Sequence, residues 1–259
     1  MNEPLNFYDM LADCYDSWQH NNDPEEWADY LNKLIECYGP EKGDGEDNSR
    51  ILVDLGCGTG KIACCMAKRG YDVIGIDSSS MMLNKAMDLC YEEQQRVLLL
   101  NQDITEYELY GTADVFVSLL DTINHLNGID DLIKIFNSFK NYMNPQGIFI
   151  FDVATEKHFA ETLNNNVFYD DEDDYTLLWT NEYDKALGIN NASITLFEKE
   201  ENEKYSRLDG NIKEIYIKEE QIVSAAEKCG LKVLAILGDK SFDKPTPRDE
   251  RVFFIVGKE

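Results

Sequence analysis

The sequence predicts an α/β protein with a doubly wound, mostly parallel sheet of seven strands and an inserted antiparallel β cap. Five apolar, strand-like runs alternate with helical stretches between residues 51 and 152, a pattern typical of a parallel sheet buried on both faces. Beyond residue 152, three strand-like segments follow one another without a helix, which is typical of an antiparallel meander. With 259 residues and 43% hydrophobic side chains, the chain can bury one large α/β core and a cap.

The N-terminal residues are expected to be helical. Asp23-Pro24 is a helix start signal, and we predict a helix over residues 22–37. The polar, glycine-rich stretch 39–48 cannot continue this helix and is predicted to be a linker into the main fold. Residues 1–45 are therefore expected to form an N-terminal helical lid.

The α/β core is expected in two parts, residues 46–157 and 218–259. Its first part has predicted helices over 60–69, 80–94 and 129–142, and predicted strands over 51–55, 72–76, 97–100, 114–119 and 147–152. Right-handed crossovers between these strands produce a doubly wound sheet. The second part has a predicted helix from about residue 218 to 229, followed by strands over 231–237 and 251–257.

The inserted cap is expected over residues 158–217. Its predicted antiparallel strands are 175–180, 192–197 and 212–217. The acidic run 170–174 is predicted to be a solvated loop before the first of them.

The charge balance bears on partners. The chain has 50 acidic and 24 basic side chains and a net charge of -26, which would repel a polyphosphate backbone, so nucleic acid is an unfavourable partner. The same charge favours a cationic or amine ligand, unless the acidic surface serves solubility alone.

The cysteines and the N-terminus bear on location. The seven cysteines are an odd number and show no C-x-x-C spacing of a zinc site, so we expect free thiols in a reducing cytoplasm and no metal. Residues 1–20 lack a basic segment followed by an apolar core, and no stretch approaches the roughly 18–20 apolar residues of a membrane span. We therefore expect a cytoplasmic protein that is neither secreted nor inserted in a membrane.

A glycine loop follows the first predicted strand. The segment from Val53 to Gly60 reads VDLGCGTG and runs directly into the helix over 60–69. Glycines there let the backbone approach a ligand closely, and the helix N-terminus offers free N–H groups, although tight turns after strands are common without any ligand. The spacing is G-x-G-x-G rather than the G-x-G-x-x-G of dinucleotide sites, which argues against a pyrophosphate.

Acidic residues end the next two strands. Asp77 follows the second strand and can accept both hydroxyl protons of a ribose, or it can cap the helix that begins near Ser80. Asp103 follows the third strand and can accept from an adenine amine, with Ile104 packed on the ring. The carboxyl ends of parallel strands meet at one edge, so the loop and both carboxylates are predicted to form one site.

The segment from Val53 to Gly60 resembles motif I of class I S-adenosylmethionine-dependent methyltransferases, and Asp77 and Asp103-Ile104 lie where the family's next two motifs fall. The resemblance implies a Rossmann-like methyltransferase fold and S-adenosyl-L-methionine as cofactor. It implies that Gly56 and Gly58 border the methionine moiety, that Asp77 holds the ribose and that Asp103 holds the adenine amine. The same segments, with the N-terminal lid and the fourth strand, add the other expected cofactor-binding residues, which are Tyr15, Asp54, Cys57, Gly60, Ser78, Ile104 and Leu119.

The fourth strand is followed by a polar segment. It resembles the family's fourth motif, where acceptor and methyl donor meet, so Leu119 and Leu120 would supply walls and carbonyls. Asp121, Asn124 or His125 could orient an acceptor or remove its proton, and His125 is the best general base because imidazole titrates near the pH of the cell. We therefore predict His125 and Asp121 as catalytic residues, although His125 could only hydrogen-bond at a helix start and Asp121 could be a helix cap.

Aromatic residues offer further candidates. Tyr8 and Tyr15 share one face if residues 5–17 are helical, and they could enclose a sulfonium by cation–π attraction or simply pack in the core. The resemblance places this segment over the cofactor as a lid. The cap adds aromatics that could line an acceptor pocket or seal the cap against the core, namely Phe168, Tyr175, Trp179, Tyr183 and Phe197.

The leading functional hypothesis is an S-adenosylmethionine-dependent methyltransferase that transfers a methyl group to nitrogen or oxygen of a small molecule by in-line displacement. Similarity of the N-terminal segment and the cap to sugar and glycine N-methyltransferases motivates the small acceptor. The chain is expected to be a monomer or a homodimer. Alternatives are a cofactor-binding regulatory or scaffold protein without turnover, a nicotinamide dehydrogenase, and a methyltransferase with a macromolecular acceptor.

Overall fold

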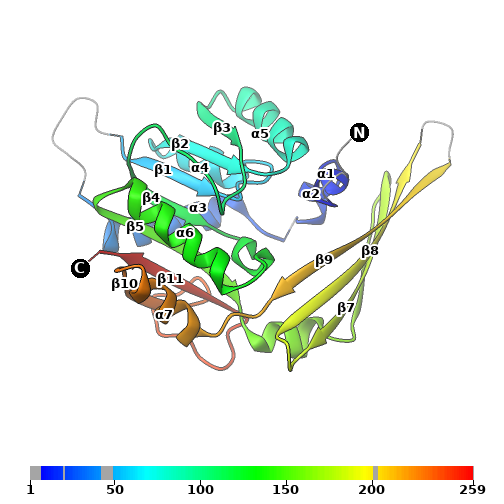
Figure 1. Cartoon of the computed structure of the whole chain (residues 1–259). Coiled ribbons are helices and arrows are strands. Elements are labelled where there is room, and N and C mark those ends of the chain that lie inside the picture. Colours follow the sequence, from blue (N-terminus) through cyan, green and yellow to red (C-terminus); the bar gives the residue numbers. More distant parts are fainter. Residues whose placement is uncertain (1–6, 20, 42–48, 201–203, 259) are drawn as a thin grey trace.

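The computed structural model describes residues 7–19, 21–41, 49–200 and 204–258. These residues form a seven-stranded sheet flanked by helices and a separate four-stranded sheet (Figure 1). The predicted linker over 39–48 falls mostly outside the described residues. In the described part of the chain, no helix is both long and apolar enough to cross a membrane.

The large sheet has the order β10-β11-β5-β4-β1-β2-β3. Its strands are β1 (Ile51–Leu55), β2 (Asp72–Asp77), β3 (Val97–Asn101), β4 (Ala113–Ser118), β5 (Met143–Ala154), β10 (Lys232–Gly238) and β11 (Arg251–Gly257). Strands β1 to β5 pair in parallel, whereas β11 is antiparallel to both of its neighbours. This arrangement confirms the predicted doubly wound, mostly parallel sheet.

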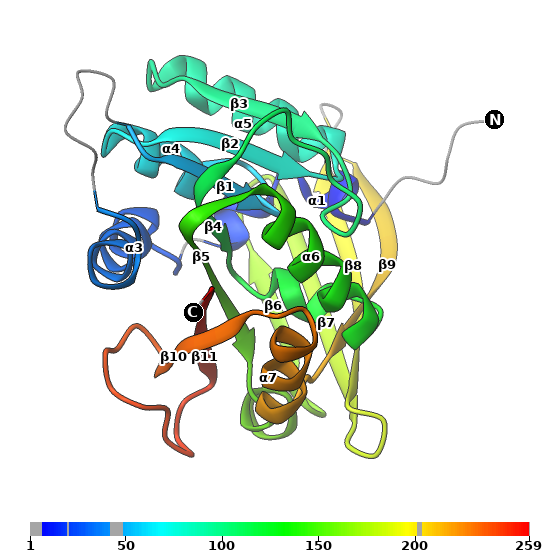
Figure 2. The same ribbon diagram turned by 60° about the vertical axis from the view of Figure 1, so that its left-hand side comes forward.

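Helices cover both faces of the large sheet, as Figure 2 shows from a second direction. They are α3 (Pro24–Tyr38), α4 (Lys61–Lys68), α5 (Ser80–Glu92), α6 (Ile129–Tyr142) and α7 (Glu219–Lys228). The predicted helix over 129–142 and the predicted strands over 51–55 and 251–257 coincide with α6, β1 and β11, and the other core elements differ by a few residues at their ends.

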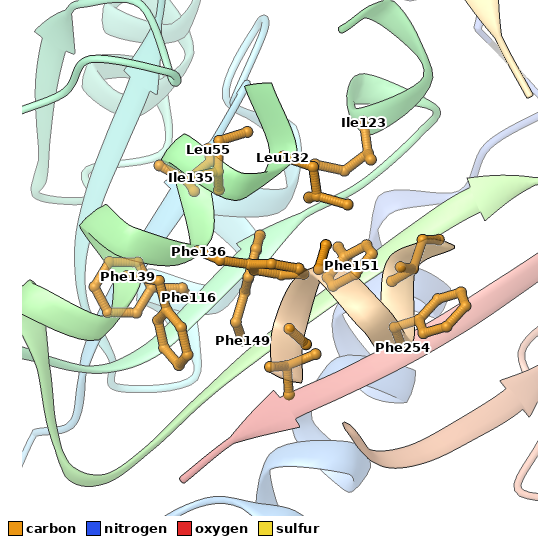
Figure 3. Close-up of a cluster of buried hydrophobic side chains, with 14 of the residues drawn as sticks. Leu55, Phe116, Ile123, Leu132, Ile135, Phe136, Phe139, Phe149, Phe151 and Phe254 are labelled. Atoms are coloured by element: carbon orange, nitrogen blue, oxygen red, sulfur yellow. The ribbon is translucent and has the colours of Figure 1, made fainter. Parts of the chain in front are cut away.

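Alternation along the central strands builds two cores. On β5, Phe149 and Phe151 are fully buried in the core shared with α6 and α7, whereas Ile148 and Ile150 point to the core under α3 and α4. Figure 3 shows the first core, where the Phe149 and Phe151 ring centroids lie 4.9 Å apart. The rings of Phe151 and Phe254 stack at 5.3 Å between centroids, which joins β5 to β11. Burial of these rings is the main force that closes the sheet against its helices.

The N-terminal residues do not act as one lid. In α3 the apolar residues recur at helical spacing, and Trp27, Leu31, Leu34 and Ile35 are buried in the core under β1 and β4. Helix α3 is thus part of the α/β layers. Its start is the predicted one, because the Asp23 carboxylate accepts from the Glu25 N–H at 3.0 Å.

The segment before α3 is broken rather than continuous. It forms α1 (Phe7–Leu11) and α2 (Tyr15–Trp18), so one helix across 5–17, the condition under which Tyr8 and Tyr15 would share a helix face, is not met by the described residues. The Cys14 N–H donates to the Leu11 carbonyl at 3.0 Å, which closes a tight turn and redirects the chain between the two short helices. These two helices lie between the large sheet and the small one (Figure 1).

The small sheet is an antiparallel meander of β6 (Val167–Asp171), β7 (Tyr175–Asp184), β8 (Ile189–Lys199) and β9 (Tyr205–Ile215). A short π-helix, η2 (His158–Leu163), precedes it. Of the acidic run predicted to be a solvated loop, residues 172–174 are the exposed connection between β6 and β7. Asp170 instead lies in β6, where it pairs with Leu177 of β7 and accepts from the Tyr175 hydroxyl at 2.5 Å. The inner face of the small sheet packs against Leu11 and Cys14.

Candidate functional site

The loop after β1 is pressed against β2. The N–H groups of Gly56 and Cys57 both donate to the Ile76 carbonyl, at 2.8 and 3.0 Å. Gly56 and Gly58 have φ angles of +81° and +53°, in the left-handed region that favours glycine. A Cβ on Gly56 would lie 2.5 Å from the Thr122 side chain, whereas a Cβ on Gly58 would meet nothing within 4 Å. Gly58 therefore borders open space.

Asp77 is held by the same loop. Its Oδ2 accepts from the Gly58 N–H at 2.9 Å and its Oδ1 accepts from the Ser79 N–H at 2.8 Å. Burial raises the pKa of Asp77, and these backbone donors counteract part of that rise. The alternative in which Asp77 caps the next helix is wrong, because Ser79 is the cap and its hydroxyl accepts from the Met82 N–H at 3.1 Å.

A cavity of about 590 Å³ opens at this edge of the sheet. It contains most of the predicted cofactor residues, since its lining includes Tyr15, Gly56, Gly58, Asp77, Ser78, Asp103 and Ile104. Asp103 is exposed at the end of β3, and its Oδ1 accepts from the Thr105 N–H at 2.7 Å. Tyr8 lines the same cavity from α1, which together with α2 is called the lid below. Leu120 and His125 line it from the segment after β4.

A second cavity of about 70 Å³ also borders the glycine loop. Asp54, Cys57 and Leu119 line it, together with Gly56 and Gly58. Burial, with a smaller contribution from the nearby Asp77, raises the pKa of Asp54 to about 7. The loop thus has a carboxyl group behind it that is poised between its two ionisation states near neutral pH.

Gly60 lines neither of these two cavities. Its φ is +77°, and a Cβ there would lie 2.7 Å from the Cβ of Ala86 in α5. The structure therefore gives Gly60 a packing role between the glycine loop and α5, and does not bring it to the cavities with the other predicted residues.

A third cavity of about 150 Å³ adjoins the first. The two share Tyr8, Tyr15, Leu120, His125 and Ile212 in their linings, so these residues form the junction between them. Most of the remaining wall comes from the small sheet and η2, and Trp18 and Asp121 also line it. The residues from η2 and the small sheet are His158, Trp179, Asn181, Ala192, Ile194 and Glu214.

The junction contains a tyrosine and histidine pair. The Tyr8 hydroxyl lies 2.8 Å from His125 Nε2, and burial raises the pKa of Tyr8. The Tyr8 and Tyr15 ring centroids are 6.2 Å apart, edge to face. His125 is the last residue of a 3₁₀ helix, η1 (Thr122–His125), so it does not lie at a helix start. Its partner on the lid was not identified by sequence reasoning.

Asn124 joins three elements instead of facing the junction. It is fully buried, its Nδ2 donates to the Ile215 carbonyl of β9 at 2.8 Å, and its Oδ1 accepts from the Ala154 N–H of β5 at 2.9 Å. Both polar ends of the side chain are engaged, so Asn124 holds the small sheet and the large sheet together at this edge.

Asp121 is part of a buried ion network. Arg251 Nη2 donates to Asp121 Oδ2 at 2.9 Å, Arg251 Nη1 lies 2.9 Å from Asp121 Oδ1, and Nη1 also contacts the Asp152 carboxylate. Although burial opposes it, Arg251 holds the pKa of Asp121 below its usual value. Asp121 has a φ of +67° and makes no capping hydrogen bond to η1, so the helix-cap alternative is wrong.

Arg251 was missed by sequence reasoning. It begins β11 opposite Ala154, at the end of β5. Antiparallel pairing therefore brings the first residue of β11 to the carboxyl edge of the parallel strands. A single arginine at a strand start carries no sequence signal of its own, because its partners come from two other segments.

Acidic residues tie the lid helices to the edge of the large sheet. The Ser79 hydroxyl donates to Asp9 at 2.5 Å, and the Thr59 hydroxyl donates to Asp16 at 2.7 Å. Lys85 forms an ion pair with Asp13 at 2.6 Å. The lid is thereby held over the first cavity by the loops that follow β1 and β2 and by α5.

The aromatic residues of the small sheet divide in two groups. Trp179 lines the third cavity, packs edge to face on Trp18 of α2 with centroids 5.4 Å apart, and stacks on Phe168 at 5.2 Å. The others, Tyr175, Tyr183 and Phe197, do not line that cavity. Trp179 is thus the member of the predicted set that the structure brings to the site.

Known proteins resemble this chain along its whole length. A family model described as a methyltransferase domain matches residues 52–147. Over 254 residues the chain is 30% identical to YqeM of Bacillus subtilis (strain 168), which carries the name of a methyltransferase, and the match covers 97% of each chain. A solved S-adenosylmethionine-dependent methyltransferase from Clostridium acetobutylicum ATCC 824 is 26% identical with a TM-score of 0.81, over 98% of this chain and 99% of that one.

One further solved structure is similar in fold alone. It is a sugar N-methyltransferase from Streptoalloteichus sp ATCC 53650, with 14% identity and a TM-score of 0.75. The match covers 100% of this chain and 96% of that one, so it includes the small sheet as well as the large one.

The ion network predicts a large effect of Arg251→Met on stability. Removal of the guanidinium leaves the carboxylates of Asp121 and Asp152 buried without a cation, which should cost about 3–5 kcal/mol in the free energy of unfolding. Urea denaturation at neutral pH measures this loss. Arg207→Met, which removes an exposed ion pair with Asp209, is the matched control and should change stability little.

The second substitution in this test is Asp152→Asn in the Arg251→Met background. It removes one of the two buried charges and should restore part of the lost stability. An Arg251→Met protein as stable as the wild type would show that the network does not stabilise the fold.

Proposed function

This chain belongs to the class I S-adenosylmethionine-dependent methyltransferases, and from this premise we propose that it methylates a small molecule held in the third cavity. It is an enzyme, and its methyl donor is S-adenosyl-L-methionine. The observation that carries the proposal is the cavity of about 150 Å³ that joins the larger one at Tyr8, Tyr15, Leu120, His125 and Ile212. An apolar cavity of about 150 Å³ holds benzene in another protein, so this one is the size of a single ring.

The residues of the first two cavities fit the cofactor. Gly58 leaves space where any side chain would project, and Asp77 presents a carboxylate at the end of β2 that suits ribose hydroxyls. Asp103 and Ile104 at the end of β3 suit an adenine ring and its amine. Asp54, behind the glycine loop in the smaller cavity, suits the positively charged amino end of the methionine moiety.

Few groups are needed for the chemistry. When bound, S-adenosylmethionine supplies an electrophilic methyl group for in-line displacement. His125, fixed by the Tyr8 hydroxyl at 2.8 Å, would accept the proton of the nitrogen or oxygen nucleophile at the junction. Asp121 is a poorer proton acceptor because Arg251 stabilises its ionised form, so its proposed role is to hold that arginine in place behind the lining of the third cavity. The lid and the small sheet would exclude water.

The competing functions have less support. Membership of a methyltransferase family disfavours the nicotinamide dehydrogenase and the binding protein without turnover. A macromolecular acceptor is disfavoured by the third cavity, whose lining comes from the lid, the large sheet and the small sheet. The fold of the solved sugar N-methyltransferase includes a comparable small sheet, which supports a small acceptor bound between the two sheets.

The proposal is tested by the size of the methylated product. Purified enzyme, methyl-labelled S-adenosylmethionine and a cell extract fractionated by mass are incubated together. Label should appear in the fraction below about 1 kDa, because a cavity of single-ring size excludes polymers. A His125→Ala variant is the control for enzymatic transfer and should lose most of the incorporation. Label that appears only in protein or nucleic acid would contradict the small-molecule proposal.

The Gly58→Ala substitution tests how closely the cofactor approaches the glycine loop. The new methyl group would enter the space reserved for the cofactor, and its φ of +53° adds about 1–2 kcal/mol of backbone strain. We expect the affinity for S-adenosylmethionine, measured by calorimetry, to fall at least about tenfold. Gly70→Ala is the matched control, because Gly70 has a φ of +86°, equally open space and no part in the cavities. The proposed site is wrong if both variants bind the cofactor equally well.

The raised pKa of Asp54 predicts that both the stability of the protein and its affinity for the cofactor depend on pH. Its pKa of about 7 in the folded protein exceeds the ordinary value of 3.8, so the folded state holds an extra proton between these pH values. The free energy of unfolding should therefore decrease as pH rises from about 4 to about 7, and Asp54→Asn should remove this decrease.

A cationic amine beside Asp54 favours the ionised carboxyl group. Affinity should therefore rise by up to about tenfold per pH unit below about pH 7 and level off above it. Calorimetry in buffers of different ionisation enthalpy should detect proton release on binding below pH 7. S-adenosylhomocysteine has the same amino group and should show the same dependence. Equal affinity of wild-type protein at all these pH values would separate Asp54 from the cofactor.

A further inference from the structure

Glu214 is a carboxylate in the third cavity without a cation to balance it. It lies on β9 opposite Asn190, and its Oε2 accepts from the Asn190 Nδ2 at 2.9 Å. Among the described residues, no lysine or arginine forms an ion pair with Glu214 and no hydrogen bond reaches its Oε1. Glu214 lines the third cavity and not the first, so it faces the space proposed for the acceptor rather than the cofactor.

The other charged groups of this cavity have partners. Asp121 is paired with Arg251, and His158 Nδ1 lies 3.0 Å from the Glu250 carboxylate. His125 is bonded to Tyr8. Burial raises the pKa of Glu214, with His125 and His158 opposing the rise and Asp121 adding to it. A cation placed beside Glu214 would therefore relieve an unfavourable buried charge.

A second observation points to a polar ligand in the same cavity. Asn181 lies on β7 in the cavity wall and is 6% exposed. Its Oδ1 accepts from Asn190, but its Nδ2 has no hydrogen-bond partner within the described part of the chain. Buried donors in native proteins are nearly always bonded, so this unpaired donor calls for a ligand that also carries a hydrogen-bond acceptor.

Aromatic walls complete the surroundings. Trp18 and Trp179 pack edge to face in the lining, and Tyr15 closes it toward the junction. Ring faces of this kind attract cations and cover the apolar surface of a small ring. The size of the third cavity, the charge of Glu214 and the aromatic walls thus all suit a small cationic ring.

We propose that Glu214 binds the protonated amine of the methyl acceptor, so that the enzyme is an N-methyltransferase for a ring-sized amine. This inference rests on the proposed function, because it takes the third cavity as the acceptor site. The ion pair brings the nitrogen to the junction, where His125 accepts a proton before the nitrogen attacks the methyl carbon and the C–S bond electrons pass to sulfur. Glu214 is the acceptor-binding group in this step.

The test compares two probes of nearly equal shape on the product complex. Wild-type protein is saturated with S-adenosylhomocysteine, which prevents turnover, and is titrated with cyclohexylamine or with cyclohexanol by calorimetry. We expect the amine to bind about tenfold to hundredfold more tightly than the alcohol, as for a charge-assisted hydrogen bond. Equal affinity for both probes, or no binding of the amine, would overturn the inference.

Glu214→Gln is the variant that assigns the preference to one residue. The amide keeps an oxygen for Asn190 and removes only the charge, so the preference for the amine should disappear. Affinity for S-adenosylhomocysteine should stay unchanged and shows that the variant is folded. Asp209→Asn removes an exposed carboxylate from the same strand and should keep the preference.

The outcomes separate the two levels of the proposal. Failure of wild-type protein to bind S-adenosylhomocysteine would contradict the proposed function itself. Normal binding of S-adenosylhomocysteine with an amine preference that persists in Glu214→Gln would contradict only the role of Glu214.

Discussion

The site depends on the parallel pairing of β1 with β2 and β4. Parallel strands end at the same edge, so this pairing brings the loop after β1, the Asp77 carboxylate and the segment after β4 within reach of one another. The hydrogen bond of 2.9 Å from the Gly58 N–H to the Asp77 carboxylate joins the loop after β1 to the end of β2. Gly58 lines the cavity at this edge, and a Cβ there would meet nothing within 4 Å.

The first and third cavities meet at residues that come from distant parts of the chain. The lid contributes Tyr8 and Tyr15, η1 contributes His125, and β9 contributes Glu214. Asn124 connects η1 to β5 and β9 through its two hydrogen bonds, so the position of the small sheet is coupled to that of the junction. The third cavity is therefore a product of the assembly of the two sheets and the lid.

Buried charge is distributed unevenly around this assembly. Asp121 and Asp152 share one arginine, and the guanidinium favours the ionised form of the buried Asp121 carboxyl group. Glu214 and Asp54 have no such partner among the described residues, and their pKa values are raised. These two carboxyl groups lie beside the cavities, where cationic ligands can balance them, whereas the paired carboxylates hold the fold together.

The amino-acid sequence by itself determined the sheet and the cofactor, and most of the residues predicted from it for cofactor binding line the first cavity. Strand periodicity, the G-x-G-x-G loop and the acidic residues after β2 and β3 are local patterns, and each needs only a few neighbouring residues to be recognised. The tertiary structure decided what no local pattern encodes: the break between α1 and α2, the place of α3 in the core, and the pairing of Tyr8 with His125 and of Arg251 with Asp121. These contacts join residues more than 100 positions apart, so their partners are chosen by packing and not by spacing.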